Sequence, residues 1–213
     1  REKLISDVWG YDFYGDVRTL DTHVKLLRKS LGDYAERITT LRGVGYRFEK
    51  DRDFGFTLSE RYGRGSARDP KVIKGEDGRF HMFLTTSLVE EGKGCLAHYV
   101  SEDMEKWEDF GEPIYIAPSE EQPECPDYFK YNGKYYLIFS LKGKAHYMFS
   151  DKPFENFVMP DDPIVPCASV PKCAEWDGRL IFSGFKGIGG YGGSMTFKAA
   201  IADERGELLF KEL

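Results

Sequence analysis

The sequence has only four cysteines among 213 residues, and no two of them form a C-x-x-C pair. The four histidines are not spaced with these cysteines as zinc ligands are, so the common structural zinc motifs are excluded. Four cysteines could form two disulfides, or they could all remain free thiols. We expect neither a metal nor a cofactor. The cysteines are Cys95, Cys125, Cys167 and Cys173.

Long apolar runs are also missing, because no stretch is long enough to cross a membrane. Nothing at the N-terminus has the pattern of a secretory signal. These two absences favour a cytoplasmic protein with no membrane partner. The formal net charge of −6 argues against a chain that binds nucleic acid over its whole length.

What is present divides the chain near residue 50. Residues 1–50 hold ten Lys or Arg against eight Asp or Glu, whereas the remainder holds 20 basic and 28 acidic residues. The 23 glycines, 13 tyrosines and 16 phenylalanines favour strands and turns after the first fifty residues. A chain of this length can form two small domains, and the change of charge indicates where they join.

The first fifty residues predict a helix, a turn, a second helix and a basic hairpin, and the first helix is indicated by Leu4, Ile5 and Val8 within residues 1–9. Leu20, Val24, Leu27 and Leu31 recur in steps of four, three and four, as an amphipathic helix requires, and Gly32 follows as a stop. "RITTLRGVGYRFE" predicts two short strands around a glycine-rich turn. This layout is typical of DNA-binding proteins, in which the second helix enters the major groove. The alternative is a helix with a solvated basic face.

"VWGYDFYGDVRTLDTHVKLLRKSLG" followed by "ITTLRGVGYRFE" resembles the winged-helix effector domain of OmpR/PhoB-type response regulators. The resemblance covers nearly all of residues 1–49. It does not extend to the N-terminal sheet and first helix of that family, so the predicted helix is expected to lack part of its usual packing. The resemblance implies contacts to double-stranded DNA from Arg18, Thr22, Lys25 and Arg28, and a wing contact from Arg42.

Residues 66–213 contain internal repeats. "EDGRFHMFLTT", "YNGKYYLIFS" and "WDGRLIFSGF" each place Asp-Gly or Asn-Gly before a strand-like run, which is a hairpin signal. "AHYVSEDMEKWEDFGEPI" and "AHYMFSDKPFENFVMPDDPI" form a second repeated unit. Units of about 40–50 residues with several strands each predict propeller blades, here about three. A jelly roll or a sandwich is the alternative.

Two carboxylates precede strand-like segments in successive repeats. "SARDPKV" carries Asp69 and "PECPDYF" carries Glu124, each beside a proline. Paired carboxylates at one site can divide proton donation from charge stabilisation, as glycoside hydrolysis requires. The alternative is that both segments are ordinary turns.

"ARDPKV", "GCLAHYVSEDMEKWEDFGE", "ECPDYFKYNGKYYLIFS" and "YGGSMTF" resemble the five-bladed propeller of glycoside hydrolase family 32, the invertase and fructanase family. The resemblance covers residues 67–213 and implies a fructosyl-type substrate. It implies that Asp69 stabilises the transition state with Arg68 beside it, and that Glu124 is the general acid/base. A retaining glycosidase is the activity that follows.

The sequence departs from that family at the nucleophile. The family places it in an N-D-P-N-G-type motif of the first blade, upstream of R-D-P, and this chain shows no such motif. Asp51 and Asp53 lie in that region without the motif's neighbours. The first blade and the C-terminal β-sandwich of the family are unmatched. We therefore expect weak or absent hydrolysis.

Two further patterns are less specific. "GIGGYG" (187–192) fits the G-x-G-x-x-G pattern of dinucleotide-binding loops, but a strand-like segment follows it instead of a helix. His98 and His146 each stand in a repeated Ala-His-Tyr, which favours a packing role over a catalytic one.

The sequence thus predicts a mainly β protein with a small α+β N-terminal segment, a partial winged helix followed by a partial β-propeller. The expected domains are 1–50, a junction at 51–66, and 67–213. The preferred function is a fusion-like chain whose larger part derives from a fructan- or sucrose-type glycoside hydrolase. The alternatives are a DNA-binding regulator of two-component signalling, and a non-catalytic scaffold or engineered chimera that self-associates through open blade edges.

Overall fold

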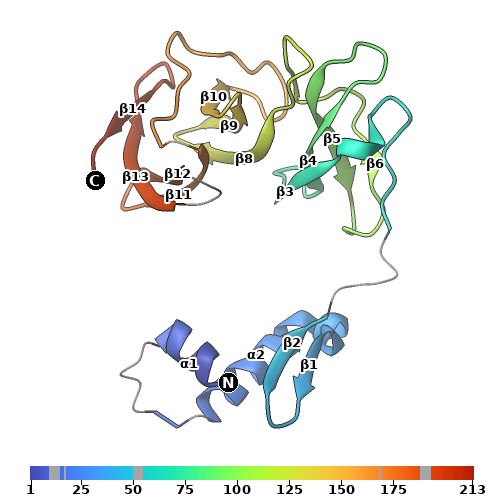
Figure 1. Ribbon diagram of the computed structural model, residues 1–213, viewed down its shortest axis with the longest axis vertical. Coiled ribbons are helices and arrows are strands. Elements are labelled where there is room, and N and C mark those ends of the chain that lie inside the picture. The colour runs from blue at the N-terminus through green and yellow to red at the C-terminus, as the bar shows by residue number, and fades with distance from the viewer. Residues whose placement is uncertain (10–14, 17, 50–54, 168, 188–192) are drawn as a thin grey trace. The chain divides into compact units, whose positions relative to one another are not determined.

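The computed structural model describes residues 1–9, 15, 16, 18–49, 55–167, 169–187 and 193–213. The chain forms two compact units, Arg1–Gly55 and Phe56–Leu213 (Figure 1). Among the described residues, the first unit is helical with one small hairpin, and the second is built from antiparallel strands and turns with one short 3-10 helix.

The described part of the first unit forms two α-helices, a 3-10 helix and a hairpin. Its elements are α1 (Glu2–Trp9), α2 (Arg18–Leu31), the 3-10 helix η1 (Gly32–Arg37), β1 (Ile38–Leu41) and β2 (Gly45–Phe48). Asp16 caps α2, because its carboxylate accepts a hydrogen bond of 2.8 Å from the backbone N–H of Arg18. Asp21 in the first turn and Lys29 in the last both suit the helix dipole.

The core of the first unit is small. Ile5, Leu20, Val24 and Ile38 are buried together, and Leu31 packs against them. Leu27, which the helical spacing places on the same face, is instead 50% exposed, and Leu26 beside it is 55% exposed. The apolar face of α2 is therefore only partly covered within this unit.

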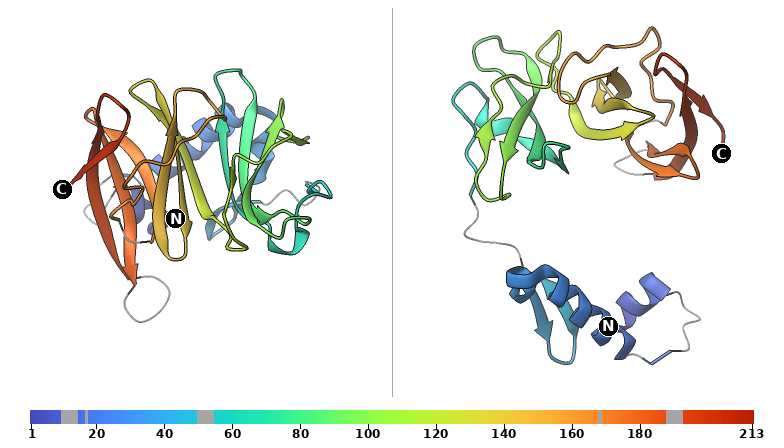
Figure 2. Two further views of the ribbon diagram at one scale, coloured as in Figure 1. Left: turned by 90° about the horizontal axis from the view of Figure 1, so that it is seen from above. Right: turned by 180° about the vertical axis from the view of Figure 1, so that it is seen from behind.

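The described residues of the second unit form three antiparallel sheets that follow one another along the chain (Figures 1 and 2). After η2 (Arg64–Ser66), the first sheet has the order β3-β4-β5-β6 with β7 paired to β5; the second is β10-β9-β8; the third is β11-β12-β13-β14. The bounds of the strands in the first sheet are β3 Arg68–Lys74, β4 Phe80–Ser87, β5 Gly94–Ser101, β6 Glu108–Asp109 and β7 Tyr115–Ile116. Those of the other two sheets are β8 Glu124–Tyr131, β9 Lys134–Leu141, β10 Lys144–Ser150, β11 Ser169–Trp176, β12 Arg179–Gly187, β13 Gly193–Ala202 and β14 Leu208–Lys211.

Strand β9 shows why these sheets stack. Leu137 and Phe139 point toward the first sheet and join a core with its Phe83. Tyr136 and Ile138, which alternate with them, point toward the third sheet and join a core that contains Phe182. Because both faces of β9 are covered, residues 135–139 in the middle of the strand are all aromatic or aliphatic, as in strands buried on both sides.

The segment that begins the second unit covers the free face of the first sheet. Leu58 and Tyr62 are buried against Met82, Leu84 and other side chains of that sheet. The three sheets, each packed face to face on the next, form a partial β-propeller. The predicted fold class, a small α+β segment followed by partial propeller blades, is confirmed.

Candidate functional site

The inner strands of the three sheets begin in the same way. In β3, β8 and β11 the pairing register shifts between the first residue and the fourth, which marks a β-bulge. The bulges contain the sequences Arg68-Asp69-Pro70-Lys71, Glu124-Cys125-Pro126-Asp127 and Ser169-Val170-Pro171-Lys172. Sequence reasoning found the first two segments and missed the third, although a proline at the third position is common to all three.

The second residue of each bulge has a positive φ. The values are 54° at Asp69, 52° at Cys125 and 43° at Val170. A residue before proline normally adopts an extended conformation, and a β-branched residue such as Val170 rarely has φ above zero. Strained backbone of this kind persists where the surroundings impose it and concentrates at functional sites. The repeated bulge re-aims the side chains at one end of the three inner strands.

Arg68 connects the first bulge to the second. Its Nη2 donates a hydrogen bond of 2.6 Å to Glu124 Oε1, and its Nη1 donates to the side-chain oxygen of Gln122. Its Nε lies 3.8 Å from Asp69 Oδ2. The guanidinium therefore faces both predicted carboxylates, whose side chains remain 32% (Asp69) and 48% (Glu124) exposed.

Asp69 also contacts the second bulge directly. Its Oδ2 accepts a hydrogen bond of 3.2 Å from the backbone N–H of Cys125, and the Cys125 thiol lies 3.4 Å from the same oxygen. Burial raises the pKa of the Cys125 thiol to about 11, and the nearby Asp69 carboxylate adds to the effect. The thiol is thus held protonated, so that it can donate to Asp69.

An open recess of about 530 Å³ lies beside this cluster. Its lining residues are Arg68, Glu120, Glu121, Gln122, Glu124, Lys142 and Gly143. The loop that carries Glu121 passes so close to Gly94 that a Cβ there would stand 2.0 Å from the backbone oxygen of Glu121. Gly94 also bonds to the loop through its backbone N–H, which donates to Ser119. The loop is therefore held against the start of β5.

This arrangement brings two carboxylates, Asp69 and Glu124, together with the guanidinium of Arg68, which stays positively charged. A carboxylate facing solvent can accept hydrogen bonds from sugar hydroxyls, and a second can transfer a proton. Glu124 is engaged by Arg68, so it must leave the guanidinium before it can protonate a leaving group. Asp51 and Asp53, which the sequence raised as substitute nucleophiles, lie outside the described residues.

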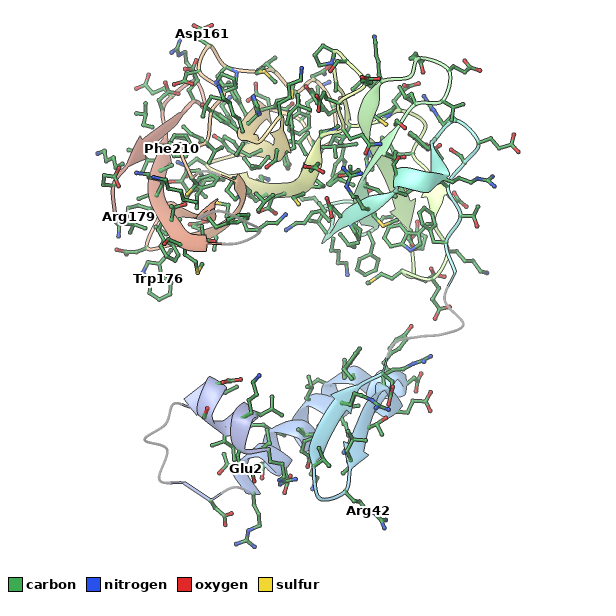
Figure 3. All side chains as sticks on the ribbon, in the orientation of Figure 1. Glu2, Arg42, Asp161, Trp176, Arg179 and Phe210 are labelled. Atoms are coloured by element: carbon green, nitrogen blue, oxygen red, sulfur yellow. The ribbon has the colours of Figure 1, made fainter. Side chains whose placement is uncertain are left out.

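In the first unit, most of the residues predicted to contact DNA are exposed. Arg18, Thr22 and Lys25 lie on the exposed face of α2. Arg42 is at the tip of the β1–β2 hairpin and points away from it (Figure 3). These four side chains are free of the core that Leu20 and Val24 form on the other face of the helix.

Arg28 is placed differently. Its guanidinium donates to the backbone oxygen of Ile38 and, at 2.9 Å, to Thr40 Oγ1. It also lies 5.7 Å from the centre of the Tyr46 ring. The side chain is half-buried and ties α2 to the hairpin, a long-range contact that helical periodicity does not reveal.

The remaining sequence features have plain structural outcomes. All four cysteines are free thiols. Within the described ranges, no group of three or more His, Cys, Asp or Glu side chains is placed to hold a metal ion. No described helix is both long and apolar enough to span a bilayer. The "GIGGYG" pattern lies, apart from Gly187, outside the described residues.

Comparisons with known proteins match different parts of the chain. The family described as "Transcriptional regulatory protein, C terminal" matches residues 1–48. The transcriptional regulatory proteins ResD of Bacillus subtilis and SrrA of Staphylococcus aureus are each 55% identical over 53 residues, which is 23% of this chain and 22% of theirs. The chain therefore spans about a fifth of the length of these curated relatives. Its N-terminal unit is similar to the C-terminal segment of transcriptional regulatory proteins.

Solved structures resemble most of the chain. Bombyx mori GH32 beta-fructofuranosidase BmSUC1 has a TM-score of 0.60 at 17% identity, covering 83% of this chain and 43% of that one. Fructan 1-exohydrolase IIa from Cichorium intybus has a TM-score of 0.57 at 17% identity, with coverages of 74% and 37%. An exo-1,5-alpha-L-arabinanase from a bovine ruminal metagenomic library has a TM-score of 0.56 at 17% identity, with coverages of 82% and 66%. At these identities the likeness establishes the propeller fold alone.

The family described as "Glycosyl hydrolases family 32 N-terminal domain" matches residues 38–160, and it overlaps the first match over the β1–β2 hairpin. The chain is thus fusion-like, with a response-regulator segment joined to part of a glycoside hydrolase. Because the second match spans more than half of its residues, the chain belongs to glycosyl hydrolase family 32.

Proposed function

We propose that the second unit binds a fructosyl-type carbohydrate at the mouth formed by the bulges of β3 and β8. The observation that carries this proposal is the position of Arg68, which faces Asp69 and donates to Glu124 across two adjacent sheets. Charged groups from different sheets converge beside an open recess of about 530 Å³. Ligand sites are typically concave and contain a few convergent polar groups.

The roles of the three residues follow from their chemistry. Asp69 accepts hydrogen bonds from sugar hydroxyls and stabilises positive charge, Arg68 orients both acids, and Glu124 exchanges the proton. The two family 32 structural neighbours support the substrate class by their names, and the fructan exohydrolase was solved in complex with 1-kestose. A retaining mechanism also needs a nucleophilic carboxylate at about 5–5.5 Å from the acid. No residue of the described chain is assigned that role, so we propose binding with little or no turnover.

Isothermal titration of the full chain with fructose, sucrose and 1-kestose tests the proposal. Wild type should bind at least one of these sugars. Asp69→Asn and Glu124→Gln, which preserve shape, should weaken that binding about tenfold or more, since hydrogen bonds to charged groups contribute roughly 1.5–3 kcal/mol. Asp161, which is labelled in Figure 3, lies on an exposed loop. Asp161→Asn is therefore the matched control and should bind the sugar as wild type does. Absence of binding to all three sugars by wild type would refute the proposal.

We also propose that the first unit contacts double-stranded DNA through Arg18, Thr22, Lys25 and Arg42. The specific observation is that a basic helix face and a basic hairpin tip are exposed on one unit of 55 residues. Basic side chains that reach phosphates give affinities that fall steeply with salt. Electrophoretic mobility shifts with direct-repeat operator DNA at low and moderate salt test this function separately from sugar binding.

Self-association is a third proposal. Met195 and Phe197 on β13 and Leu209 on β14 are 65%, 46% and 49% exposed, so the third sheet presents apolar side chains next to an edge strand. Exposed edges and apolar faces favour association between chains. Light scattering across a wide concentration range tests it, and a monomer throughout would refute it.

A further inference from the structure

The fourth residue of each bulge carries a charge, and the three charges alternate in sign. They belong to Lys71 in β3, Asp127 in β8 and Lys172 in β11. The middle one is buried, because the Asp127 side chain is only 3% exposed. A buried carboxylate costs free energy unless all its lone pairs find partners. The groups that stabilise the buried Asp127 carboxylate therefore have to be identified separately from the sugar-binding residues.

Asp127 connects all three inner strands. Its Oδ1 pairs with Lys71 Nζ at 2.6 Å, which reaches β3. Its Oδ2 accepts a hydrogen bond of 2.9 Å from the backbone N–H of Cys173, which reaches β11. Its own strand contributes the Tyr128 N–H at 3.0 Å. One buried carboxylate thus fixes the bulge of β8 from both sides.

Lys172 adds a second connection from β11 to the same bulge. Its Nζ donates to the backbone oxygens of Cys125 and Pro126 at 3.0 and 2.8 Å. These carbonyls lie between Glu124 and Asp127, at the point where the β8–β9 ladder is interrupted and ladder partners are missing. The lysine therefore satisfies backbone groups that the bulge leaves free.

We propose that Asp127 is the positioning residue of the candidate site, a role that rests on the proposed sugar-binding function. By joining β3 and β11 to the bulge of β8, it sets the distance between Asp69 on one sheet and Glu124 on the next. Two contacts of Cys125 report whether the acids are correctly placed. Its backbone N lies 3.2 Å and its Sγ 3.4 Å from Asp69 Oδ2. Loss of Asp127 loosens those contacts without unfolding the sheets.

Thiol labelling reads this geometry without any sugar. Iodoacetamide modifies the thiolate, so a buried thiol with a raised pKa reacts slowly, and each unit of pKa changes the rate at a fixed pH by about tenfold. Peptide mapping by mass spectrometry separates Cys125 from the other thiols. Cys95 and Cys167 are fully buried in other contacts and report on general unfolding.

In the full chain, Asp127→Asn should raise the labelling rate of Cys125 at pH 8 by about tenfold, a shift of about one pKa unit. Lys71→Met leaves the hydrogen bond from the Cys173 backbone N–H to Asp127 in place, so it should raise the Cys125 labelling rate by a smaller factor. Cys95 and Cys167 should keep their wild-type rates in both variants. Ile138→Val, at a fully buried position of β9, is the control for a general loss of stability. It should leave Cys125 unchanged.

Two labelling results would overturn the proposal. One is an unchanged Cys125 rate in Asp127→Asn, and the other is a rise at Cys125 matched by equal rises at Cys95 and Cys167. If Asp127→Asn does not fold, Lys71→Met decides by the same two criteria. Titration with 1-kestose keeps the two proposals apart, because wild type that binds no sugar refutes the function whatever the labelling rates show. A variant with altered Cys125 labelling and unaltered 1-kestose affinity would also overturn the positioning role.

Discussion

His81 Nδ1 and His98 Nε2 share a hydrogen bond of 2.8 Å in the interior of the first sheet, where both rings are fully buried. His81 Nε2 lies 3.2 Å from both carboxylate oxygens of Asp77 and donates to that carboxylate. His81 Nδ1 is then an acceptor and His98 Nε2 a donor. His98 Nδ1 is left unprotonated, with no hydrogen-bond partner in the described structure. Both histidines are therefore neutral in the folded protein.

Acid should destabilise the second unit through this pair. Burial, with smaller contributions from His81 and Arg79, lowers the pKa of His98 to about 3 against the opposing charge of Asp77. Burial also lowers the pKa of His81, although Asp77 opposes it. Because the unfolded state binds more protons below pH about 6.5, the free energy of unfolding should fall from there to pH 3. The slope over this range is about 1.4 kcal/mol per pH unit for His98, and His81 adds a loss in the same direction below pH about 6.5. Urea denaturation at a series of pH values measures it.

His98→Gln provides the variant for this measurement, since glutamine can still donate to His81 but does not titrate. It should lower stability at neutral pH by about 1–3 kcal/mol and flatten the decline between pH 6.5 and 3. The pKa of Asp77 is lowered to about 2: burial opposes this shift, but hydrogen bonds from His81 and Arg79 outweigh it. Its stabilising effect is lost only below pH about 4. Parallel pH curves for wild type and His98→Gln would contradict the prediction.

Gly94→Ala should disturb the wall of the candidate recess. The added Cβ would stand 2.0 Å from the backbone oxygen of Glu121 and 2.6 Å from the Cα of Gln122, so the loop must move. We expect a loss of about 1–3 kcal/mol in the free energy of unfolding, as for other overpacked sites. Gly65→Ala meets no atom within 4 Å and should change stability by less than about 1 kcal/mol. Equal stabilities for the two variants would show that the loop yields without cost.

The sequence predicted those parts of the structure that depend on local pattern. Asn132-Gly133 and Asp177-Gly178 form hairpin turns in which both residues have positive φ, as their sequences require. The helix expected around Leu20 and Val24 is present as α2. Contacts between sheets could not be predicted from the sequence. The Lys71–Asp127 pair, for example, joins residues 56 positions apart and depends on how whole sheets pack.

The same dependence on tertiary contacts explains why helical periodicity does not predict the surroundings of Arg28. The helical pattern places Arg28 on the side that faces solvent. In the structure the hairpin lies beside it, and the Arg28 guanidinium donates to the backbone oxygen of Ile38. The proline common to the three bulges was visible in the sequence, and it would have pointed to Lys172. Its meaning becomes clear only when the three inner strands lie next to one another.

Arg28 and Arg42 should differ in their effects on the first unit. Arg42→Ala should weaken binding to operator DNA and reduce the slope of log affinity against log salt by about 0.9, the value for one phosphate contact. Arg28→Ala should mainly lower stability, by about 1 kcal/mol, because it removes a donor from Ile38 and Thr40. Filter binding at several salt concentrations and thermal unfolding separate the two effects. A loss of salt slope in Arg28→Ala with unchanged unfolding would reverse their assignment.

Purified protein should show little or no hydrolysis of sucrose, inulin or levan. Glu124 can exchange a proton and Asp69 can hold the sugar, but the chain has no N-D-P-N-G-type nucleophile upstream of Arg68. General acid catalysis alone contributes roughly 10²–10⁴-fold, far less than the roughly 10⁶–10¹⁷-fold of typical enzymes. Release of reducing sugar by wild type is compared with that by Glu124→Gln and Asp69→Asn. Robust wild-type turnover that is lost in both variants would show that the site is complete. A carboxylate from Asp51, Asp53 or a second copy of the chain would then be the candidate nucleophile.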